Sequence, residues 1–357
     1  MKRLLIISKE QFGYHTDIYK WCQYLRDDYD IEVVTFGGKE IVEMEGVTNH
    51  YVSNRGTRSV RGIRYILTCL CHILFFKGVI LVCYFRECHI LKRIFPRKKM
   101  LLDIRTLDVS SDVSTRHKEN ALIKQCTDLY DYVTIISEGL RKKINLDDEK
   151  SAVLPLGADP VSVNHKTFEN LRLLYVGTLF NRDVHKTIEG LNLVIKSMPE
   201  MDVHYDIVGD GLGDERTELQ RMINEMGIDD KVTLHGYIQH SRLNDFLDKC
   251  NVGVSFVPIT EYYDFQPATK SFEYILSGLY TIATGTYCNK EIINESNGVI
   301  IDDTPEAFAS AVLGVYNHLG EIQKADIQLT LSDYTWKNIV NIKMKAILDY
   351  FVNIFSI

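Results

Sequence analysis

Short apolar runs recur along the chain, and each is followed by a polar or glycine-containing turn and then by a segment with helical spacing of apolar residues. The first two runs are residues 3–8 and 31–36, with a helix expected over about 16–27 between them. Buried parallel strands have such continuous apolar sequences, and strands that alternate with helices indicate βαβ units. The pattern therefore predicts an α/β architecture with parallel sheets, and 357 residues suggest two domains.

The alternation continues through most of the chain. We expect further strands at 100–104, 132–136, 152–156, 171–176, 203–208, 231–234, 252–256 and 280–284, with 297–301 continuing the order. Helices are expected over 113–129, from a cap at Ser137, from after 182 to about 197, and over 214–226, 269–276 and 305–318. The tail, residues 335–355, has apolar positions at helical spacing and predicts a long amphipathic helix that packs on the rest of the protein.

Residues 65–85 form the longest apolar run, and 21 residues would suffice to span a bilayer. Lys77 and Gly78 divide it, however, so a buried helix followed by a strand is the preferred interpretation. The flanking sequence is basic: residues 51–100 hold eleven Lys and Arg but one acidic residue, Glu87. With the overall charge of −7, this segment carries +10 and the remainder −17.

Basic and apolar side chains together predict that residues 55–99 contact an anionic membrane surface as an interfacial segment. A solvated basic face is the plain alternative. Aromatic-interleaved RNA-binding motifs are absent from the sequence, which argues against nucleic acid as a partner.

Eight cysteines are scattered without a C-x-x-C pair, and no Cys/His set has zinc-like spacing. Most of them sit in apolar runs, as reduced core cysteines do. The apolar run at the start (MKRLLIIS) is too short for a signal peptide. We therefore expect a cytoplasmic protein, with peripheral contact to the inner face of the plasma membrane.

The most informative stretch is residues 256–284, which predicts a strand, a polar loop, a helix and another strand. Lys270 and Glu273 lie in the first turns of the helix, three residues apart and so on one face. The carboxyl ends of parallel strands are where α/β folds bind ligands. A surface ion pair is the simpler explanation of these two residues alone.

Pro267, Lys270, Glu273, Tyr274 and Gly278 fit the pattern P-x-x-K-x-x-E-Y-x-x-x-G. This pattern resembles that of the retaining glycosyltransferases of family 4, which have two Rossmann-like domains facing each other across a cleft (GT-B fold). The resemblance implies that Glu273 binds the ribose of a nucleotide-sugar donor, and that the start of the helix, with Lys270, faces its diphosphate.

One position departs from the family pattern. Many members carry another Glu near the donor sugar, eight residues before the ribose-binding Glu, and here that position is Phe265. Asp264 or Glu261 in the same loop are the candidates to take its place.

The second half of the chain also resembles the family at its first glycine turn. Gly177 and Thr178 correspond to a turn that approaches the diphosphate, and Arg182 and Lys186 to cations that neutralise it, here as catalytic groups. Four residues apart, Arg182 and Lys186 would share a face if both were helical.

Two later turns continue the resemblance in the family's order. Gly209 and Gly211 match a strand-to-helix turn near the donor, and Gly236 with Tyr237 matches a turn whose backbone lies against the nucleobase. One glycine turn is a weak signal, whereas several in family order are a strong one.

The first half carries the resemblance less densely. Its first turn, Gly13, Tyr14 and His15, corresponds to the acceptor side, and His117 to a region where a His approaches the transferred sugar. The resemblance implies domains of 1–160 (acceptor) and 161–334 (donor), with a C-terminal helix, 335–357, that crosses back onto the first.

The predicted function is transfer of a sugar from a nucleoside diphosphate sugar to a hydroxyl of a glycan or lipid-linked acceptor, with retention of configuration. No metal or other cofactor is expected, because no Asp-x-Asp pair follows a strand at a suitable site and Lys and Arg would take the place of Mg²⁺. Two alternatives remain: a nucleotide-sugar 2-epimerase of the same fold, and a catalytically silent nucleotide-binding protein, which Phe265 favours.

Overall fold

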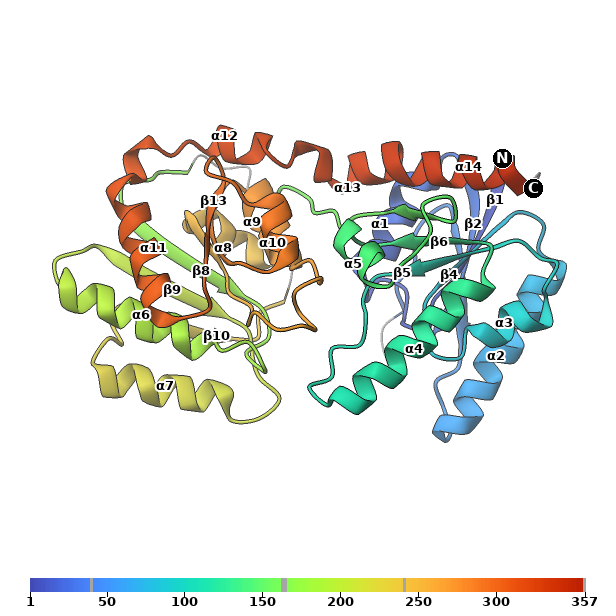
Figure 1. The fold of residues 1–357 in the computed structure, drawn as a ribbon, viewed down its shortest axis with the longest axis horizontal. Coiled ribbons are helices and arrows are strands. Elements are labelled where there is room, and N and C mark those ends of the chain that lie inside the picture. Colours follow the sequence, from blue (N-terminus) through green and yellow to red (C-terminus); the bar gives the residue numbers. More distant parts are fainter. Residues whose placement is uncertain (39–40, 162–165, 240–241, 356–357) are drawn as a thin grey trace. The chain divides into compact units, whose positions relative to one another are not determined.

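The computed structural model describes residues 1–38, 41–161, 166–239 and 242–355 (Figure 1). The chain forms two compact units: unit 1 is Met1–Leu156 with Trp336–Ile357, and unit 2 is Gly157–Thr335. The expected domain boundaries lie within four residues of these.

Unit 1 contains a seven-stranded sheet in the order β3-β2-β1-β4-β5-β6-β7, in which all pairs are parallel. Its strands are β1 (Lys2–Ile7), β2 (Tyr29–Phe36), β3 (Val47–Val52), β4 (Val79–Cys83), β5 (Met100–Ile104), β6 (Tyr132–Ile135) and β7 (Ser151–Val153). Helices α1 (Thr16–Leu25), α2 (Arg58–Phe75), α3 (His89–Ile94), α4 (Val113–Leu129) and α5 (Glu138–Lys143) connect them.

Unit 2 contains a six-stranded parallel sheet in the order β10-β9-β8-β11-β12-β13. Its strands are β8 (Leu171–Val176), β9 (Val203–Val208), β10 (Val232–Gly236), β11 (Val252–Ser255), β12 (Tyr280–Thr284) and β13 (Gly298–Ile301). Its α-helices are α6 (Val184–Ser197), α7 (Glu215–Met226), α8 (Leu243–Lys249), α9 (Thr269–Leu276), α10 (Tyr287–Ile292), α11 (Pro305–Asn317) and α12 (Lys324–Leu329).

The α/β class and the parallel sheets are confirmed, and most strands and helices lie within a few residues of their predicted bounds. The long apolar run forms a helix and a strand that are separated at 76–78, as expected. Its helix, α2, begins well before the run, because the Thr57 hydroxyl accepts a hydrogen bond from the Val60 N–H (3.4 Å) and caps it. Among the described residues, no helix is long and apolar enough to cross a membrane.

Some details of the prediction are wrong. The last strand of unit 1 ends at Val153 rather than 156, and α1 ends at Leu25 rather than at about 27. The edge strand β3 and the short helices α3, α8, α10 and α12 were not predicted, since brief segments show too few periods for a pattern.

The C-terminal segment returns to unit 1, as expected. It comprises α13 (Trp336–Asn338), a π-helical stretch (Ile339–Met344) and α14 (Lys345–Phe355), and it packs on α1. The side chains of Trp336 and Phe351 are buried there. The π-helical stretch interrupts what the sequence predicted as one continuous helix.

Asn251 fixes the start of the unit 2 sheet. Its buried side-chain amide accepts from the Arg172 N–H (3.0 Å) and donates to the carbonyls of Thr167 (3.0 Å) and Asn170 (2.7 Å). One side chain therefore pairs three backbone groups where β8 and β11 begin.

We expect Asn251→Ala to lower the free energy of unfolding by about 3 kcal/mol, because three partly buried backbone groups lose their partner. Urea denaturation followed by circular dichroism measures the loss. Asn317→Ala, at the exposed end of α11, is the matched control and should change stability by less than about 0.5 kcal/mol. Equal effects of the two substitutions would contradict the role given to Asn251.

Candidate functional site

The order of the strands in unit 2 reverses at one place. The chain runs from β8 outward to β10, then crosses to the other side of β8 and continues from β11 to β13. In open parallel sheets, ligands bind beyond the carboxyl ends of the strands at such a switch point. The turns after β8, β9 and β10 and the start of α9 are therefore the segments that matter for binding.

The three turns are joined by their backbones. The Gly177 N–H donates to the Val208 carbonyl (3.0 Å), and the Gly209 N–H donates to the Gly236 carbonyl (2.9 Å). Gly209 has φ +145°, and a Cβ placed on it would lie 1.7 Å from the carbonyl oxygen of Gly177. Only glycine fits there, so the turns pack with bare backbone at the surface where a ligand approaches.

Helix α9 is fixed to β8 through Tyr274. Its hydroxyl accepts a hydrogen bond from the N–H of Val176, the last residue of β8, at 2.7 Å. The Tyr274 ring lies over Gly253 of β11, where a Cβ would come within 2.4 Å of ring atoms. The tyrosine of the recognised pattern thus places the start of α9 beside the Gly177 turn.

A second set of buried polar side chains holds the same helix. The Ser271 hydroxyl contacts the Ser255 hydroxyl (2.7 Å) and donates to Asn289 Oδ1 (3.0 Å), and the Asn289 amide donates to the Thr284 carbonyl (2.9 Å). These bonds tie α9 and α10 to the carboxyl ends of β11 and β12.

Two cations meet at the Gly177 turn. The Lys270 ammonium lies 3.8 Å from the centre of the Tyr175 ring, and 3.8 Å from where a Gly177 Cβ would be. The Arg182 guanidinium lies 4.2 Å from the centre of the Tyr263 ring. Burial, together with the positive charge of Arg182, holds the pKa of Lys270 well below its usual range.

The same position offers backbone donors. Helix α9 follows Ala268, whose side chain cannot cap it, and a helix start leaves N–H groups without intrahelical partners. Cations and uncapped N–H groups beside a glycine turn form an arrangement suited to an anion of the size of a diphosphate. Sequence reasoning found Lys270 and Gly177 but not the two tyrosines, for which no local signal exists.

Arg182 and Lys186 do not share a helix face. Asp183 adopts a left-handed conformation (φ +50°) at the start of α6, so Arg182 precedes the helix and Lys186 lies within it. Lys186 forms an ion pair with Asp183 (3.0 Å). Arg182 is close enough to Lys270, instead, to lower its pKa.

Thr178, Gly211, Tyr237 and Glu273 also lie in or next to these segments. Thr178 is exposed and its hydroxyl donates to the Asp210 carbonyl (3.4 Å), which links the first two turns. Tyr237 is 75% exposed, and Glu273 is partly exposed, three residues after Lys270 on α9.

The loop before α9 uses one of its two candidate carboxylates internally. Asp264 accepts a hydrogen bond from the Tyr287 N–H (2.6 Å) at the start of α10, and the Phe265 ring packs against the Tyr287 ring at 5.1 Å with a 35° tilt. Glu261 is exposed. Of the two residues considered as replacements for the missing Glu, Asp264 therefore serves to shape the loop.

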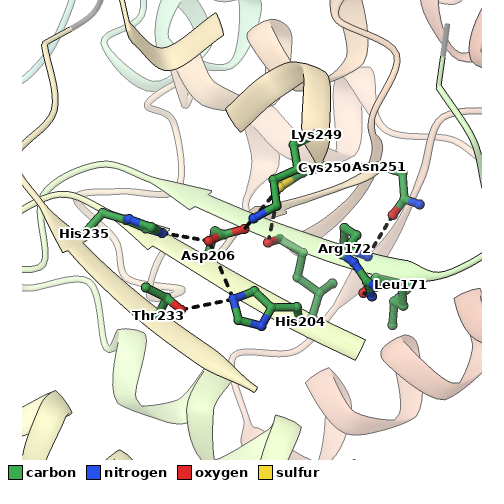
Figure 2. Close-up of polar contacts among 10 residues, drawn as sticks. Leu171, Arg172, His204, Asp206, Thr233, His235, Lys249, Cys250 and Asn251 are labelled. Atoms are coloured by element: carbon green, nitrogen blue, oxygen red, sulfur yellow. Dashed lines mark hydrogen bonds and ion pairs between the residues drawn. The ribbon is translucent and has the colours of Figure 1, made fainter. Parts of the chain in front are cut away.

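Behind the turns, Asp206 of β9 accepts hydrogen bonds from His235 (2.7 Å) and Lys249 (3.3 Å), with His204 3.7 Å away (Figure 2). Burial raises the pKa of Asp206, but the His235 hydrogen bond and the charge of Lys249 outweigh it, so the pKa lies below its usual range. His235 directly precedes Gly236, and this bond holds the end of β10 against β9.

In unit 1, Gly13 has φ +85° and faces Val42, and Tyr14 is 74% exposed with its ring 5.2 Å from that of His15. A cavity of about 390 Å³ opens after β1 and β2. Its described lining comprises Lys9, Glu10, Gln11, Tyr14, Phe36, Gly37, Gly38, Asn54, Arg58, Arg61, Gly62 and Glu87.

His117 lies on an exposed position of α4, and neither it nor His15 belongs to the described lining of this cavity. Among the described residues, the one group of His, Cys, Asp or Glu spaced to hold a metal ion also belongs to unit 1.

Part of the chain matches a known protein family. Residues 168–318, which include the three turns and α9, match the family model described as glycosyl transferases group 1. No curated protein sequence matches the chain.

Solved structures match over nearly the whole length. Sucrose-phosphate synthase from Thermosynechococcus elongatus is 15% identical, with a TM-score of 0.76, 99% of this chain and 100% of that chain covered. HepE from Anabaena in complex with UDP and glucose is 13% identical, with a TM-score of 0.77 and coverage of 98% and 100%. The lipopolysaccharide outer core galactosyltransferase WaaB is 15% identical, with a TM-score of 0.70 and coverage of 98% and 99%.

The family match covers the segment that builds the switch-point site, and the structural matches cover both units. Residues 168–318 thus carry the sequence pattern of glycosyl transferases group 1, and the chain has the GT-B fold.

Proposed function

We propose that the protein transfers a sugar from a nucleoside diphosphate sugar to a hydroxyl acceptor, with retention of the anomeric configuration. The observation that carries this proposal is the meeting of Lys270 and Arg182 at the Gly177 turn. Glycosyl transfer from such a donor releases a diphosphate, and fixed cations that face the developing charge stabilise the transition state.

Each part of the site has a task in this proposal. Lys270, Arg182 and the start of α9 bind the diphosphate, Glu273 binds the ribose hydroxyls, and exposed Tyr237 beside Gly236 offers an aromatic face to the base. Among the described residues that we assign to the site, no carboxylate is a candidate for the nucleophile. We therefore expect no covalent glycosyl-enzyme intermediate.

The donor nucleotide is best sought first among uridine nucleotides. HepE is solved in complex with UDP-glucose, and starch synthase IV from Arabidopsis thaliana is solved bound to ADP and acarbose. UDP, GDP, ADP, CMP and dTDP form a suitable panel.

We predict that one nucleotide of this panel raises the melting temperature of the wild type and fails to do so in Glu273→Ala. At a hundred times its dissociation constant a ligand adds about 2.7 kcal/mol, which differential scanning fluorimetry detects easily. Glu306→Ala, an exposed glutamate in the first turn of α11, is the control and should keep the full shift. An unchanged shift in Glu273→Ala would remove Glu273 from the donor site.

Turnover separates this proposal from its two alternatives. Following the donor by ¹H NMR shows whether it is consumed and which anomer forms. A retained glycoside that appears only with acceptor supports transfer, whereas donor consumption without acceptor and without hydrolysis indicates epimerisation. Nucleotide binding without any turnover would favour a silent binding protein.

Nucleoside diphosphate binding should take up protons through Lys270. Its pKa is depressed in the free protein, and a bound diphosphate favours the charged form, so the pKa rises on binding. Affinity should therefore fall as pH rises from the free to the bound pKa. Calorimetry across a pH series that includes pH 8, in two buffers of different ionisation enthalpy, should give uptake of up to about one proton between the free and bound pKa.

Lys270→Met should bind more weakly and lose this proton uptake, while Lys196→Met, exposed in the last turn of α6, should retain both. The phosphate itself titrates near about pH 6 and contributes little at pH 8. Equal proton uptake by wild type and Lys270→Met would show that another group titrates.

We propose further that unit 1 contacts an anionic membrane and so meets a lipid-linked acceptor. Helix α2 buries Tyr65, Cys69 and Ile73 against the sheet. On its other side it exposes a row of apolar side chains at helical spacing: Val60 (47%), Ile63 (62%), Leu67 (57%) and Leu74 (52%), followed by Phe75 (80%). A stripe of this kind is costly in water and suited to insertion among lipids.

Exposed cations flank the stripe in the sequence, and they are fewer than the sequence count suggests. Lys92 is buried and paired with Asp131 (2.6 Å), and the Arg64 guanidinium donates to the carbonyls of Ser53 and Arg55. The exposed ones are Arg55, Arg58, Lys77, Arg86, Arg93 and Arg97, and of these Arg86 pairs with Glu119 (3.2 Å). Each cation near an anionic surface contributes about 1 kcal/mol of binding free energy, in addition to that from inserting the apolar side chains.

We predict that the protein cosediments with vesicles containing phosphatidylglycerol, and less with pure phosphatidylcholine, in a salt-dependent manner. Ile63→Asp with Leu67→Asp should abolish binding without unfolding the protein, because both side chains are exposed. Ile342→Asp, 62% exposed in the C-terminal segment, should bind like the wild type. A wild type that stays in the supernatant at physiological salt would contradict the membrane proposal but leave the donor site untouched.

A further inference from the structure

Three side chains with metal-binding atoms meet between the edge of the unit 1 sheet and α2. Glu32 is on β2, His50 is on the edge strand β3, and His72 is in the last turn of α2. Val34 pairs with His50 in the register, so Glu32 and His50 are diagonal neighbours on one face of the sheet. Helix α2 packs on both strands and brings His72 to that face.

Their distances suit a tetrahedral metal site. Glu32 Oε2 lies 3.1 Å from His50 Nε2 and 3.7 Å from His72 Nδ1, and the three ligand atoms all lie within 4.8 Å of one another. Bond lengths of about 2.0–2.2 Å at tetrahedral angles place zinc ligands about 3.3 Å apart. Two of the three separations therefore need adjustments of less than about half an ångström, and the third is at most 4.8 Å.

The surroundings also fit a metal site. The Arg3 guanidinium binds the other carboxylate oxygen, Oε1, of Glu32, and Arg3 in turn contacts Asp30 (3.3 Å). This contact orients the carboxylate and leaves Oε2 directed at the histidines, as outer-shell partners of metal ligands do. A cavity of about 300 Å³, lined in part by Glu32, His72 and Cys71, gives solvent access for a fourth ligand.

We propose that Glu32, His50 and His72 bind one Zn²⁺ ion, with water as the fourth ligand. Two imidazole nitrogens and one carboxylate oxygen are the donor set that zinc takes when one position stays open. The ion would join β3, the unprotected edge of the sheet, to β2 and to the end of α2. It would stabilise unit 1 and take no part in the donor chemistry of unit 2, so this proposal is independent of the proposed function.

Without zinc, the same residues form a hydrogen bond between His50 and Glu32 (3.1 Å), and the two imidazole rings lie 4.2 Å apart. Burial and the neighbouring His50 lower the pKa of His72, against the opposing charge of Glu32. A purely hydrogen-bonded cluster is the competing explanation, and it requires no metal affinity.

The test is zinc titration of chelator-treated full-length protein in competition with a chromophoric chelator. It is done in a Cys71→Ala background, because Cys71 is an exposed thiol that could bind zinc by itself. We expect one equivalent to bind and a rise in melting temperature that saturates at that equivalent. Co²⁺ in place of Zn²⁺ should give the visible absorption of a tetrahedral site.

His50→Asn and His72→Asn should each weaken zinc binding by more than about a hundredfold, because loss of a direct ligand exceeds the 10–100-fold cost of losing an outer-shell partner. Glu32→Gln, nearly identical in shape, should do the same. Melting curves in chelator show whether each variant is folded. His318→Asn, from an exposed His–Glu pair 3.4 Å apart, should bind zinc like the parent.

Two results would overturn the proposal. One is the absence of a stoichiometric equivalent in the parent protein at zinc concentrations well above that of the protein. The other is zinc binding that survives all three substitutions, or that His318→Asn weakens equally, since zinc would then bind to scattered surface histidines.

Discussion

The close approach of Gly209 to the Gly177 carbonyl is the constraint on which the unit 2 site depends. Because no side chain fits between them, the turns after β8 and β9 pack directly, and the Gly209 N–H bonds to the third turn at Gly236. The three turns therefore form one surface at the switch point of the sheet, made of backbone atoms at these glycines. Tyr274 fixes α9 to these turns, because its hydroxyl accepts a hydrogen bond from the N–H of Val176, the last residue of β8.

The two cations at this surface are not paired with carboxylates among the described residues. Among the described residues, Lys270 and Arg182 face aromatic rings rather than carboxylates. A cation over a ring is stabilised only modestly. Burial, and secondarily the nearby charge of Arg182, make the ammonium form of Lys270 costly in the free protein. An incoming diphosphate would relieve that cost, which links the depressed pKa of Lys270 to affinity for anions.

Unit 1 places its chemistry differently, around a single helix. One side of α2 packs on the sheet through Tyr65, Cys69 and Ile73, and the other leaves Ile63 and Leu67 in water. The membrane proposal uses the exposed side. The proposed zinc ligands lie where the last turn of α2 packs on β2 and β3.

The sequence by itself determined the α/β class, most of the strands and helices, and the position of α9 with Lys270 and Glu273. These follow from local properties, namely apolar periodicity and glycine turns, and from a pattern within one short stretch. Only the tertiary structure decided which distant side chains meet. Arg182 joins Lys270 and not Lys186, because Asp183 turns the chain in a left-handed conformation before α6 begins. Likewise Glu32, His50 and His72 come together only when β2, β3 and α2 pack, and no spacing along the chain records that.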